Sequence, residues 1–447
     1  MTPGRAAAPG LVLRGGTVLT CDARSTVVRG DVLVAGGRIA ALGRVRAPEG
    51  TRSIDCRDRL ILPGLVLAHV HLCQTLFRGL ASDLPLLEWL RRRVWPLEAA
   101  HDERSLRASA ELGLSELLLA GVTTILDLGT VHDQDVVFDA CVRAGIRVIG
   151  GKSLMDSGAG VPRRLREPTA RALGDAERLA REWNGHPSGR VEHAWIPRFV
   201  LSCSERLVRG AVERARAAGA ALHTHAAEHP AERAAVRAAL GADDLTVLRR
   251  WGWRGPRASI AHGVQLRAGA RRALARDGVG VVHCPSANLK LGSGIAQVAA
   301  LRGAGVVVGL GADGAPCNDN LDPFVELRHA ALLSSVAAGP GAMPAAGALA
   351  LATRDGARLL GLEATIGSVE VGKAADLLVL RTDAPHLGLA PDPAAAVVYA
   401  AQARDVEHVL VGGEPVVAGA ELQTLDAGRV VAVARDEQRR LRRRAEV

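Results

Sequence analysis

Histidines stand in alternating pairs at two places in the sequence, as His69 with His71 and as His223 with His225. Alternate residues of a β strand face the same side, so either pair could bind a metal ion or could be hydrogen-bonded in a core. Histidine or aspartate also ends or directly follows five apolar runs of strand length, at His71, His225, His262, His283 and Asp313. Imidazoles with one carboxylate are a ligand set that zinc prefers, so convergence of these residues would favour a metal site.

Eight apolar runs lie between residues 65 and 312, at 65–71, 122–128, 147–155, 193–202, 221–225, 258–262, 279–285 and 306–312. Stretches with helical spacing of apolar residues separate most of them, for example 102–120 and 204–218. Eight strand–helix units close a (β/α)₈ barrel of the TIM type. In such barrels chemistry takes place where the strands end, which is where the histidines and Asp313 fall.

Short β-rich pieces separated by glycine turns occupy both ends of the chain, at 11–19, 31–34, 38–42 and 53–55 and again at 376–380, 406–411 and 414–417. We predict that residues 1–62 and 365–447 form one small β-sandwich domain, with a basic helix at the C-terminal end. Residues 63–364 would form the barrel, and a helix over 342–360 that stops at Gly361 would be its last.

The composition narrows the function classes. The formal net charge is +9, but the arginines are dispersed and aromatic platforms are missing, which argues against nucleic-acid binding. Seven cysteines without a CxxC pair are typical of reduced thiols in a cytoplasmic protein. We find no apolar stretch that is long enough for a signal peptide or a membrane helix, so we expect a cytoplasmic location and no membrane partner.

Several motifs in chain order resemble those of the amidohydrolase superfamily, in its aminohydrolase and chlorohydrolase branch. The first is the PGLVLAHVH segment at 63–71, followed by QTLFRG at 74–79. The others are HTHAAE at 223–228, AHG at 261–263, HCPSANLKLGSGIA at 283–296 and LGADGAPCNDNLDPFVELRHAALL at 310–333. This branch includes deaminases of adenosine derivatives, guanine deaminase and s-triazine hydrolases, so the resemblance implies a hydrolase that releases an amino group from a ring.

The resemblance also implies ligands for one divalent metal ion, namely His69, His71, His225 and Asp313. One metal ion is the expected count, because the fourth predicted strand carries no lysine to bridge two metals. We expect this ion to be Zn²⁺, with Fe²⁺ or Mn²⁺ as alternatives. His223 matches a position that is not a ligand, and we expect it to be a hydrogen-bonded core residue.

Three residues are implied to act in catalysis: Glu228, His262 and Asp313. Zinc lowers the pKa of a bound water toward neutrality. Glu228 would carry a proton from that water to a ring nitrogen, and His262 would hydrogen-bond the nucleophile or the developing oxyanion. Asp313 would bind metal and relay a proton to the departing ammonia.

The residues expected to contact substrate are Gln74, Trp89, Glu98, Arg198 and His283. In similar deaminases, the tryptophan that matches Trp89 packs on the purine or its thioether, and the glutamate that matches Glu98 grips ribose hydroxyls. Arg198 departs from this pattern, because nucleoside deaminases carry histidine there. The segment PRFVLSCSE at 197–205 instead resembles guanine deaminase, and an arginine fork could donate to a purine, a sugar hydroxyl or a carboxylate.

We therefore predict a zinc-dependent deaminase of a 5′-modified adenosine, such as 5′-deoxyadenosine, S-adenosylhomocysteine or methylthioadenosine. The alternatives are a deaminase of guanine or another oxopurine, an s-triazine hydrolase, and a barrel that serves only as a scaffold. The family resemblance further implies a homo-oligomer.

Overall fold

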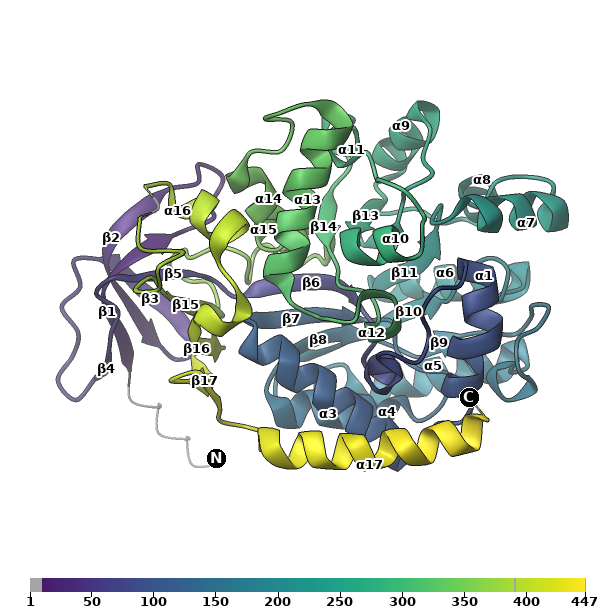
Figure 1. Ribbon diagram of the computed structural model, residues 1–447, viewed down its shortest axis with the longest axis horizontal. Helices are drawn as coiled ribbons and strands as arrows, with labels where there is room; N and C mark the ends of the chain where they lie inside the picture. Colours follow the sequence, from purple (N-terminus) through teal and green to yellow (C-terminus); the bar gives the residue numbers. More distant parts are fainter. Residues whose placement is uncertain (1–9, 390, 447) are drawn as a thin grey trace.

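The computed structural model describes residues 10–389 and 391–446. Eight parallel strands form the barrel, in the order β6, β7, β8, β10, β11, β12, β13 and β14 (Figure 1). Their bounds are β6 Leu65–Val70, β7 Val122–Asp127, β8 Arg147–Gly150, β10 Val191–Pro197, β11 Ala221–Ala226, β12 Ala258–His262, β13 Gly280–His283 and β14 Val308–Leu310, with a short β9 at Ser153–Leu154 beside β10. The predicted TIM barrel is confirmed.

The barrel closes at the end of β14, where the backbone N–H groups of Ala312 and Asp313 both donate to the carbonyl of His69, at 3.1 Å each. This contact joins the last strand to the first. It also fixes Asp313 beside His69, because the two residues share a hydrogen bond through the backbone.

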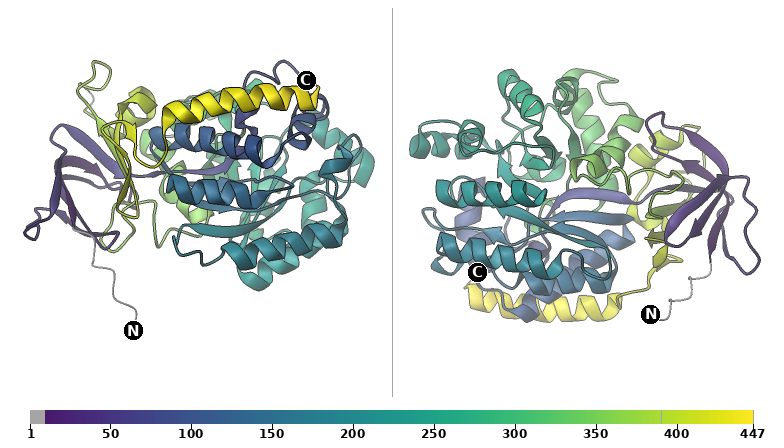
Figure 2. Two further views of the ribbon diagram at one scale, coloured as in Figure 1. Left: turned by 90° about the horizontal axis from the view of Figure 1, so that it is seen from below. Right: turned by 180° about the vertical axis from the view of Figure 1, so that it is seen from behind.

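Helices follow most strands and cover the outside of the barrel (Figures 1 and 2). Their bounds are α1 Leu86–Trp89, α2 Trp95–Ala99, α3 Glu103–Leu119, α4 Gln134–Ala144, α5 Thr169–Trp183, α6 Glu205–Ala218, α7 Pro230–Leu240, α8 Asp244–Arg250, α9 Ala268–Asp277, α10 Pro285–Lys290, α11 Val298–Gly303, α12 Ala315–Asn318 and α13 Pro323–Ala338. Short 3₁₀ turns lie at Leu72–Phe77, Arg163–Leu165 and Ala403–Asp405, and π turns at Leu90–Val94 and Ala396–Ala400. The side chains of Asp102 and Ser204 cap α3 and α6, as residues of this type do at helix starts.

The helix predicted over 342–360 is two helices, α14 (Ala345–Leu351) and α15 (Arg354–Leu359). The break falls at Ala352 and Thr353, where the Ala352 carbonyl accepts a hydrogen bond from the backbone N–H of Val66 at 2.8 Å. A continuous helix would use that carbonyl internally, so the break frees it for the first barrel strand. Gly361 follows with φ +73°, the left-handed conformation expected after a helix.

Both chain ends contribute to one small β domain beside the barrel (Figure 1). Its strands are β1 Leu11–Leu19, β2 Val27–Ala35, β3 Arg38–Gly43, β4 Arg52–Asp55, β5 Arg59–Pro63, β15 Leu377–Arg381, β16 Val406–Val411, β17 Glu414–Ala418 and β18 Glu421–Leu422. A short helix, α16 (Pro393–Ala395), lies between β15 and β16, and α17 (Ala427–Ala445) follows β18. The strands belong to a single hydrogen-bonded sheet, in which β5 pairs with β1 on one side and β15 on the other. We predicted no strand at β5 or β18. The boundaries at residues 62 and 364 stay a prediction.

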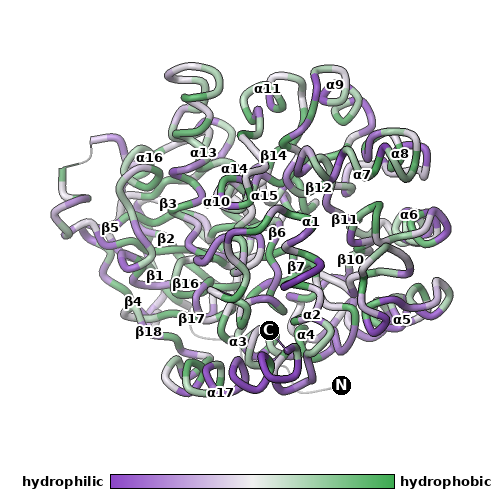
Figure 3. The backbone as a smooth tube through the Cα atoms, turned by 45° about the vertical axis from the view of Figure 1, so that its right-hand side comes forward, coloured by the Kyte–Doolittle hydropathy of each residue, from purple (hydrophilic) through white to green (hydrophobic). Residues whose placement is uncertain are grey.

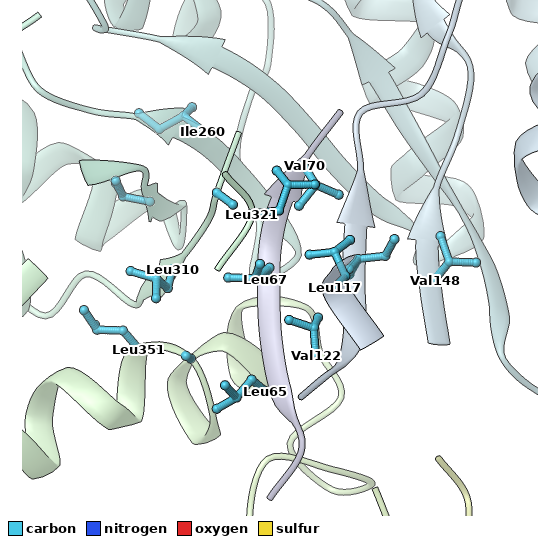
Figure 4. Close-up of a cluster of buried hydrophobic side chains, with 14 of the residues drawn as sticks. Leu65, Leu67, Val70, Leu117, Val122, Val148, Ile260, Leu310, Leu321 and Leu351 are labelled. Atoms are coloured by element: carbon cyan, nitrogen blue, oxygen red, sulfur yellow. The ribbon is translucent and has the colours of Figure 1, made fainter. Parts of the chain in front are cut away.

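The first strand of the barrel lies at the centre of the main core. Leu65, Leu67 and Val70 of β6 have no exposed surface, and they pack with side chains of β7, β14 and α3 (Figure 4). Burial of each such side chain stabilises the fold by about 1.5–3 kcal/mol. The strand ends are therefore held rigidly, which is what a site built on them requires.

The predicted basic C-terminal helix is α17, which lies along α3 (Figure 2). Ala434 and Leu441 are buried against the barrel, whereas the arginines of the last turns make this end of the tube hydrophilic (Figure 3). Among the described helices, none is both long and apolar enough to span a bilayer.

Candidate metal centre and active site

Four side chains from the ends of three strands come together at the mouth of the barrel. His69 lies near the end of β6 and His71 directly follows it, His225 lies on β11, and Asp313 follows β14. Each offers one ligand atom, and these atoms all lie within 4.8 Å of one another. The Nε2 atoms of His69 and His71 are 3.4 and 3.3 Å from one Asp313 oxygen. Three imidazoles and a carboxylate at these separations fit a single divalent cation.

Hydrogen bonds behind the ligands leave the inward nitrogens free. The Nδ1 of His225 donates to the Arg198 carbonyl at 2.8 Å, which leaves its Nε2 as a lone-pair donor for a metal. The Nδ1 of His69 is 2.8 Å from the Nε2 of His223, whose own Nδ1 is 2.8 Å from the Ser259 hydroxyl. His223 is thus the hydrogen-bonded core residue that we expected.

The Nε2 of His69 is buried and has no hydrogen-bond partner among the described residues. Burial lowers the pKa of His69 to about 4, so this imidazole is neutral at pH 7 and carries an unused lone pair. A buried polar atom left in this way costs free energy unless something binds it. The orphaned nitrogen therefore supports a cation at this position.

Asp313 stays ionised in this setting. Burial by itself would raise the pKa of Asp313, but the imidazoles of His69, His71 and His262 beside it lower that pKa well below its usual range. The ionised carboxylate supplies the negative charge that a divalent ion requires.

Backbone strain accompanies the site. His262 and Asp313 are almost fully buried and adopt left-handed conformations, with φ of +73° and +60°. Residues other than glycine pay about 1–3 kcal/mol for such conformations and keep them where the surroundings enforce them, often at functional sites. Gly311 enables the close approach that precedes Asp313, because a Cβ there would lie 2.9 Å from the His69 carbonyl oxygen.

Glu228 and His262 flank the ligands without belonging to the group of four. The Nε2 of His262 is 3.5 Å from a Glu228 oxygen and 3.8 Å from Asp313. Burial first, and then the like charge of Asp313, raise the pKa of Glu228 well above its usual value. The Nδ1 of His262 lies 3.0 Å from the Oδ1 of Asn288, which orients the ring. A buried carboxyl with a raised pKa beside a metal site is typical of a proton carrier.

A cavity opens above these groups. Of the residues predicted to contact substrate, Gln74, Trp89 and Arg198 line it, together with His71, His225, Glu228, His262 and Asp313. The Trp89 indole N–H donates to the Ala81 carbonyl at 2.9 Å, which fixes the ring at the cavity wall. The cavity thus combines a polar floor with one aromatic wall, the arrangement common in small-molecule sites.

The two remaining predicted contact residues do not line the cavity. His283 is buried at the end of β13, and burial lowers its pKa to about 3. Glu98 is buried one layer back, where one carboxylate oxygen accepts from Gln74 at 2.8 Å and the other from Arg198 at 2.7 Å. Both carboxylate oxygens of Glu98 therefore already accept hydrogen bonds within the protein.

Five lining residues were absent from the predicted site: Leu86, Leu90, Phe199, Glu232 and Leu291. Leu86 lies one helical turn before Trp89, so helical spacing could have placed it with that residue, and Leu90 lies one turn beyond Leu86. Phe199 follows Arg198 directly. No sequence motif indicates Glu232, whose contacts are seen only in the structure. Its carboxylate accepts hydrogen bonds from the backbone N–H groups of Glu228 and His229.

A (β/α)₈ barrel whose mouth carries a polar pocket that fits a cation is the arrangement of a metal-dependent hydrolase. Residues 60–416 match the model of the amidohydrolase family, and the chain belongs to this family. It is 38% identical over 426 residues to a 5-methylthioadenosine/S-adenosylhomocysteine deaminase of Halobacterium salinarum, covering 94% of this chain and 95% of that one.

Two other similarities agree with this placement. A 5′-deoxyadenosine deaminase of Methanothermobacter thermautotrophicus is 36% identical over 408 residues, covering 91% of this chain and 93% of that one. The crystal structure of an adenosine deaminase from Xanthomonas campestris with bound zinc superposes with a TM-score of 0.91 at 32% identity, covering 97% of this chain and 98% of that one.

Proposed function

We propose that the protein is a zinc-dependent deaminase that releases ammonia from the purine ring of a 5′-modified adenosine. The observation that carries this proposal is the set of four ligands with Glu228 and His262 at one cavity. The names of the similar proteins support an adenosine derivative as the substrate.

Each residue of the site has its own role in the proposed reaction. His69, His71, His225 and Asp313 hold the cation, which supplies a Lewis acid that lowers the pKa of water. Glu228 takes a proton at its carboxylate and donates it to a ring nitrogen, which makes the ring electrophilic. His262 hydrogen-bonds the attacking oxygen, and Trp89 packs against the ring. Asp313, which is ionised, would accept the remaining proton of the attacking oxygen and pass it to the amino group that leaves as ammonia.

Arg198 supports one alternative, a deaminase of guanine or another oxopurine. Its guanidinium lines the cavity while only one nitrogen, Nη1, is used by Glu98, so other N–H groups can donate to a substrate acceptor. A purine carbonyl is such an acceptor, and so is a ribose hydroxyl.

A screen for ammonia release tests the proposal. The panel contains 5′-deoxyadenosine, methylthioadenosine, S-adenosylhomocysteine, guanine, 8-oxoguanine, a pterin and an s-triazine, with metal content measured on the same sample. We expect an adenosine derivative to give the highest kcat/KM. A preference for guanine would favour the alternative, and the absence of bound metal together with inactivity on the whole panel would favour a scaffold.

Two further properties belong to the same proposal. We expect the enzyme to act in the cytoplasm, because its seven cysteines are all unpaired in the structure. We also expect a homo-oligomer, which light scattering would test.

A further inference from the structure

A second, larger cavity lies at the opposite end of the barrel from the metal centre. It has a volume of about 750 Å³ and is lined near the starts of β11 and β12, at Leu222 and Ala258. The proposed catalytic residues of these two strands lie at or beyond their other ends. The cavity is thus separate from the site described above.

The lining of this cavity is strongly basic. Six of its fifteen residues are arginines, namely Arg209, Arg216, Arg249, Arg250, Arg254 and Arg257, and none of the fifteen is acidic. Arg209 and Arg216 come from α6, Arg249 and Arg250 from the C-terminal end of α8, and Arg254 and Arg257 from the loop before β12. The fold thus gathers them from two helices and a loop.

Three of the six arginines are neutralised from outside the cavity. Arg209, Arg249 and Arg257 form ion pairs with Glu205, Asp277 and Glu192, at 2.7, 2.5 and 2.5 Å. Within the described part of the chain, Arg216, Arg250 and Arg254 have no carboxylate within 4.0 Å. The cavity therefore keeps about three uncompensated positive charges, a repulsive arrangement that an anion would relieve.

The helix ends that point into the cavity do not oppose an anion. The carbonyls at the C-terminal end of a helix carry partial negative charge. Arg209 donates to the carbonyl of Arg250 at 2.8 Å, and Arg257 donates to the carbonyl of Gly219 at 3.0 Å, so paired arginines cover these carbonyls. Arg216 and Arg254 each make one long hydrogen bond, to the carbonyls of Gly252 at 3.5 Å and Arg249 at 3.4 Å, so their remaining N–H groups can donate to a ligand.

The floor between the arginines is uncharged, with Val212, Ala215, Leu222, Pro256 and Ala258. The volume falls within the range of about 300–1,000 Å³ that is usual for small-molecule sites. A planar guanidinium donates two parallel hydrogen bonds to phosphate oxygens, which makes arginine the preferred residue for phosphate recognition.

We propose that this arginine cavity binds an oligophosphate, that is, a compound with two or three linked phosphate groups. Its negative charges pair with Arg216, Arg250 and Arg254 at the rim. A nucleotide and an inorganic phosphate chain share this chemistry. The site needs neither the metal nor the substrate of the barrel mouth.

Isothermal titration calorimetry with inorganic tripolyphosphate tests the proposal. We compare the full chain with the triple variant Arg216→Gln, Arg250→Gln and Arg254→Gln. All three side chains are exposed, so the variant should fold, and circular dichroism checks this. The matched control is Arg435→Gln, Arg442→Gln and Arg443→Gln on α17, which removes the same charge from exposed arginines elsewhere. Since tripolyphosphate also chelates metals, the control, which has the same metal ligands, corrects for that heat.

We expect one equivalent to bind, with the Kd raised at least about tenfold in the cavity variant and unchanged in the control. UTP distinguishes the source, because its pyrimidine does not fit a purine site at the mouth. Tighter binding of UTP than of tripolyphosphate points to a nucleotide, and equal binding points to the phosphate chain alone. Equal affinities for the cavity variant and the control, or no binding beyond that of sulfate at the same ionic strength, would overturn the proposal.

Discussion

Left-handed residues occur in different settings in the terminal β domain and at the barrel mouth. In the β domain, left-handed residues such as Ser25 and Asp58 lie in exposed turns between strands. At the mouth, the left-handed residues His262 and Asp313 are almost fully buried. A left-handed turn residue connects strands, whereas a buried left-handed residue costs stability that only the surrounding structure can offset.

The polar groups of the two regions differ in the same way. The core of the β domain, with Leu13, Ile61 and Leu377 at its centre, is apolar. The mouth buries several histidines and carboxyl groups, and the His69 Nε2 atom has no partner among the described residues. We therefore expect the local stability to be lower at the barrel mouth than in the core of the β domain.

The largest effect is expected from Glu228→Gln, which tests whether the buried polar groups at the mouth serve chemistry. This change removes the proposed proton carrier and leaves every proposed ligand in place. We expect kcat to fall about a thousandfold while metal content and thermal stability are retained. Ammonia release and metal analysis on the same sample measure this. Glu232→Gln is the control, since Glu232 is a buried neighbour that keeps an acceptor oxygen, and its turnover should stay within the same order of magnitude. Turnover that survives in Glu228→Gln would remove Glu228 from the mechanism.

The next largest effect concerns the approach of β14 to β6. Gly311→Ala places a methyl group 2.9 Å from the His69 carbonyl oxygen, so Asp313 must shift. We expect a stability loss of about 1–3 kcal/mol. Metal affinity should fall about tenfold to a hundredfold, measured by competition with a chelator.

Gly309→Ala is the matched control for this change, two residues earlier on the same strand. Its added Cβ would meet Ala68 at 3.4 Å, an ordinary contact. If both variants lose metal equally, the close approach at Gly311 is not what positions Asp313.

The sequence predicted the barrel well for a physical reason. Its strands are buried on both faces and read as continuous apolar runs, and the capping residues Asp102 and Ser204 mark helix starts. The break at Ala352 could not be predicted, because it depends on the long-range hydrogen bond from Val66. Strand β5 was not predicted because its apolar residues run almost directly into those of β6. Only Pro63 and Gly64 separate the two apolar runs.

The sequence indicated which residues converge at the mouth more clearly than which ones line the cavity, for a related reason. The proposed metal ligands stand at strand ends, so the topology alone brings His69, His225 and Asp313 together. Substrate contacts depend on which rotamer and partner a side chain selects. Nothing local indicates that Arg198 pairs with Glu98 from α2, because the two residues are one hundred positions apart.

Arg198→His tests that pair and sharpens the comparison within the mouth itself. Histidine would release Glu98 from its ion pair and free one carboxylate oxygen for ribose hydroxyls. We expect the ratio of kcat/KM for nucleosides over free bases to rise about tenfold. The conservative variant Arg198→Lys keeps the charge and should shift the ratio less. An unchanged substrate ranking in Arg198→His would show that this residue does not select the substrate.

The smallest effect on turnover is expected in the β domain. Leu13→Ala removes a fully buried side chain from its core and should cost about 2–5 kcal/mol of stability, measured by denaturant unfolding. Val27→Ala, on a side chain that is 51% exposed, is the control and should cost far less. Because the proposed metal ligands lie at the ends of barrel strands, kcat at a temperature well below the melting midpoint should not change in either variant. A fall in kcat for Leu13→Ala without loss of folded protein would mean that the β domain helps to position the barrel mouth.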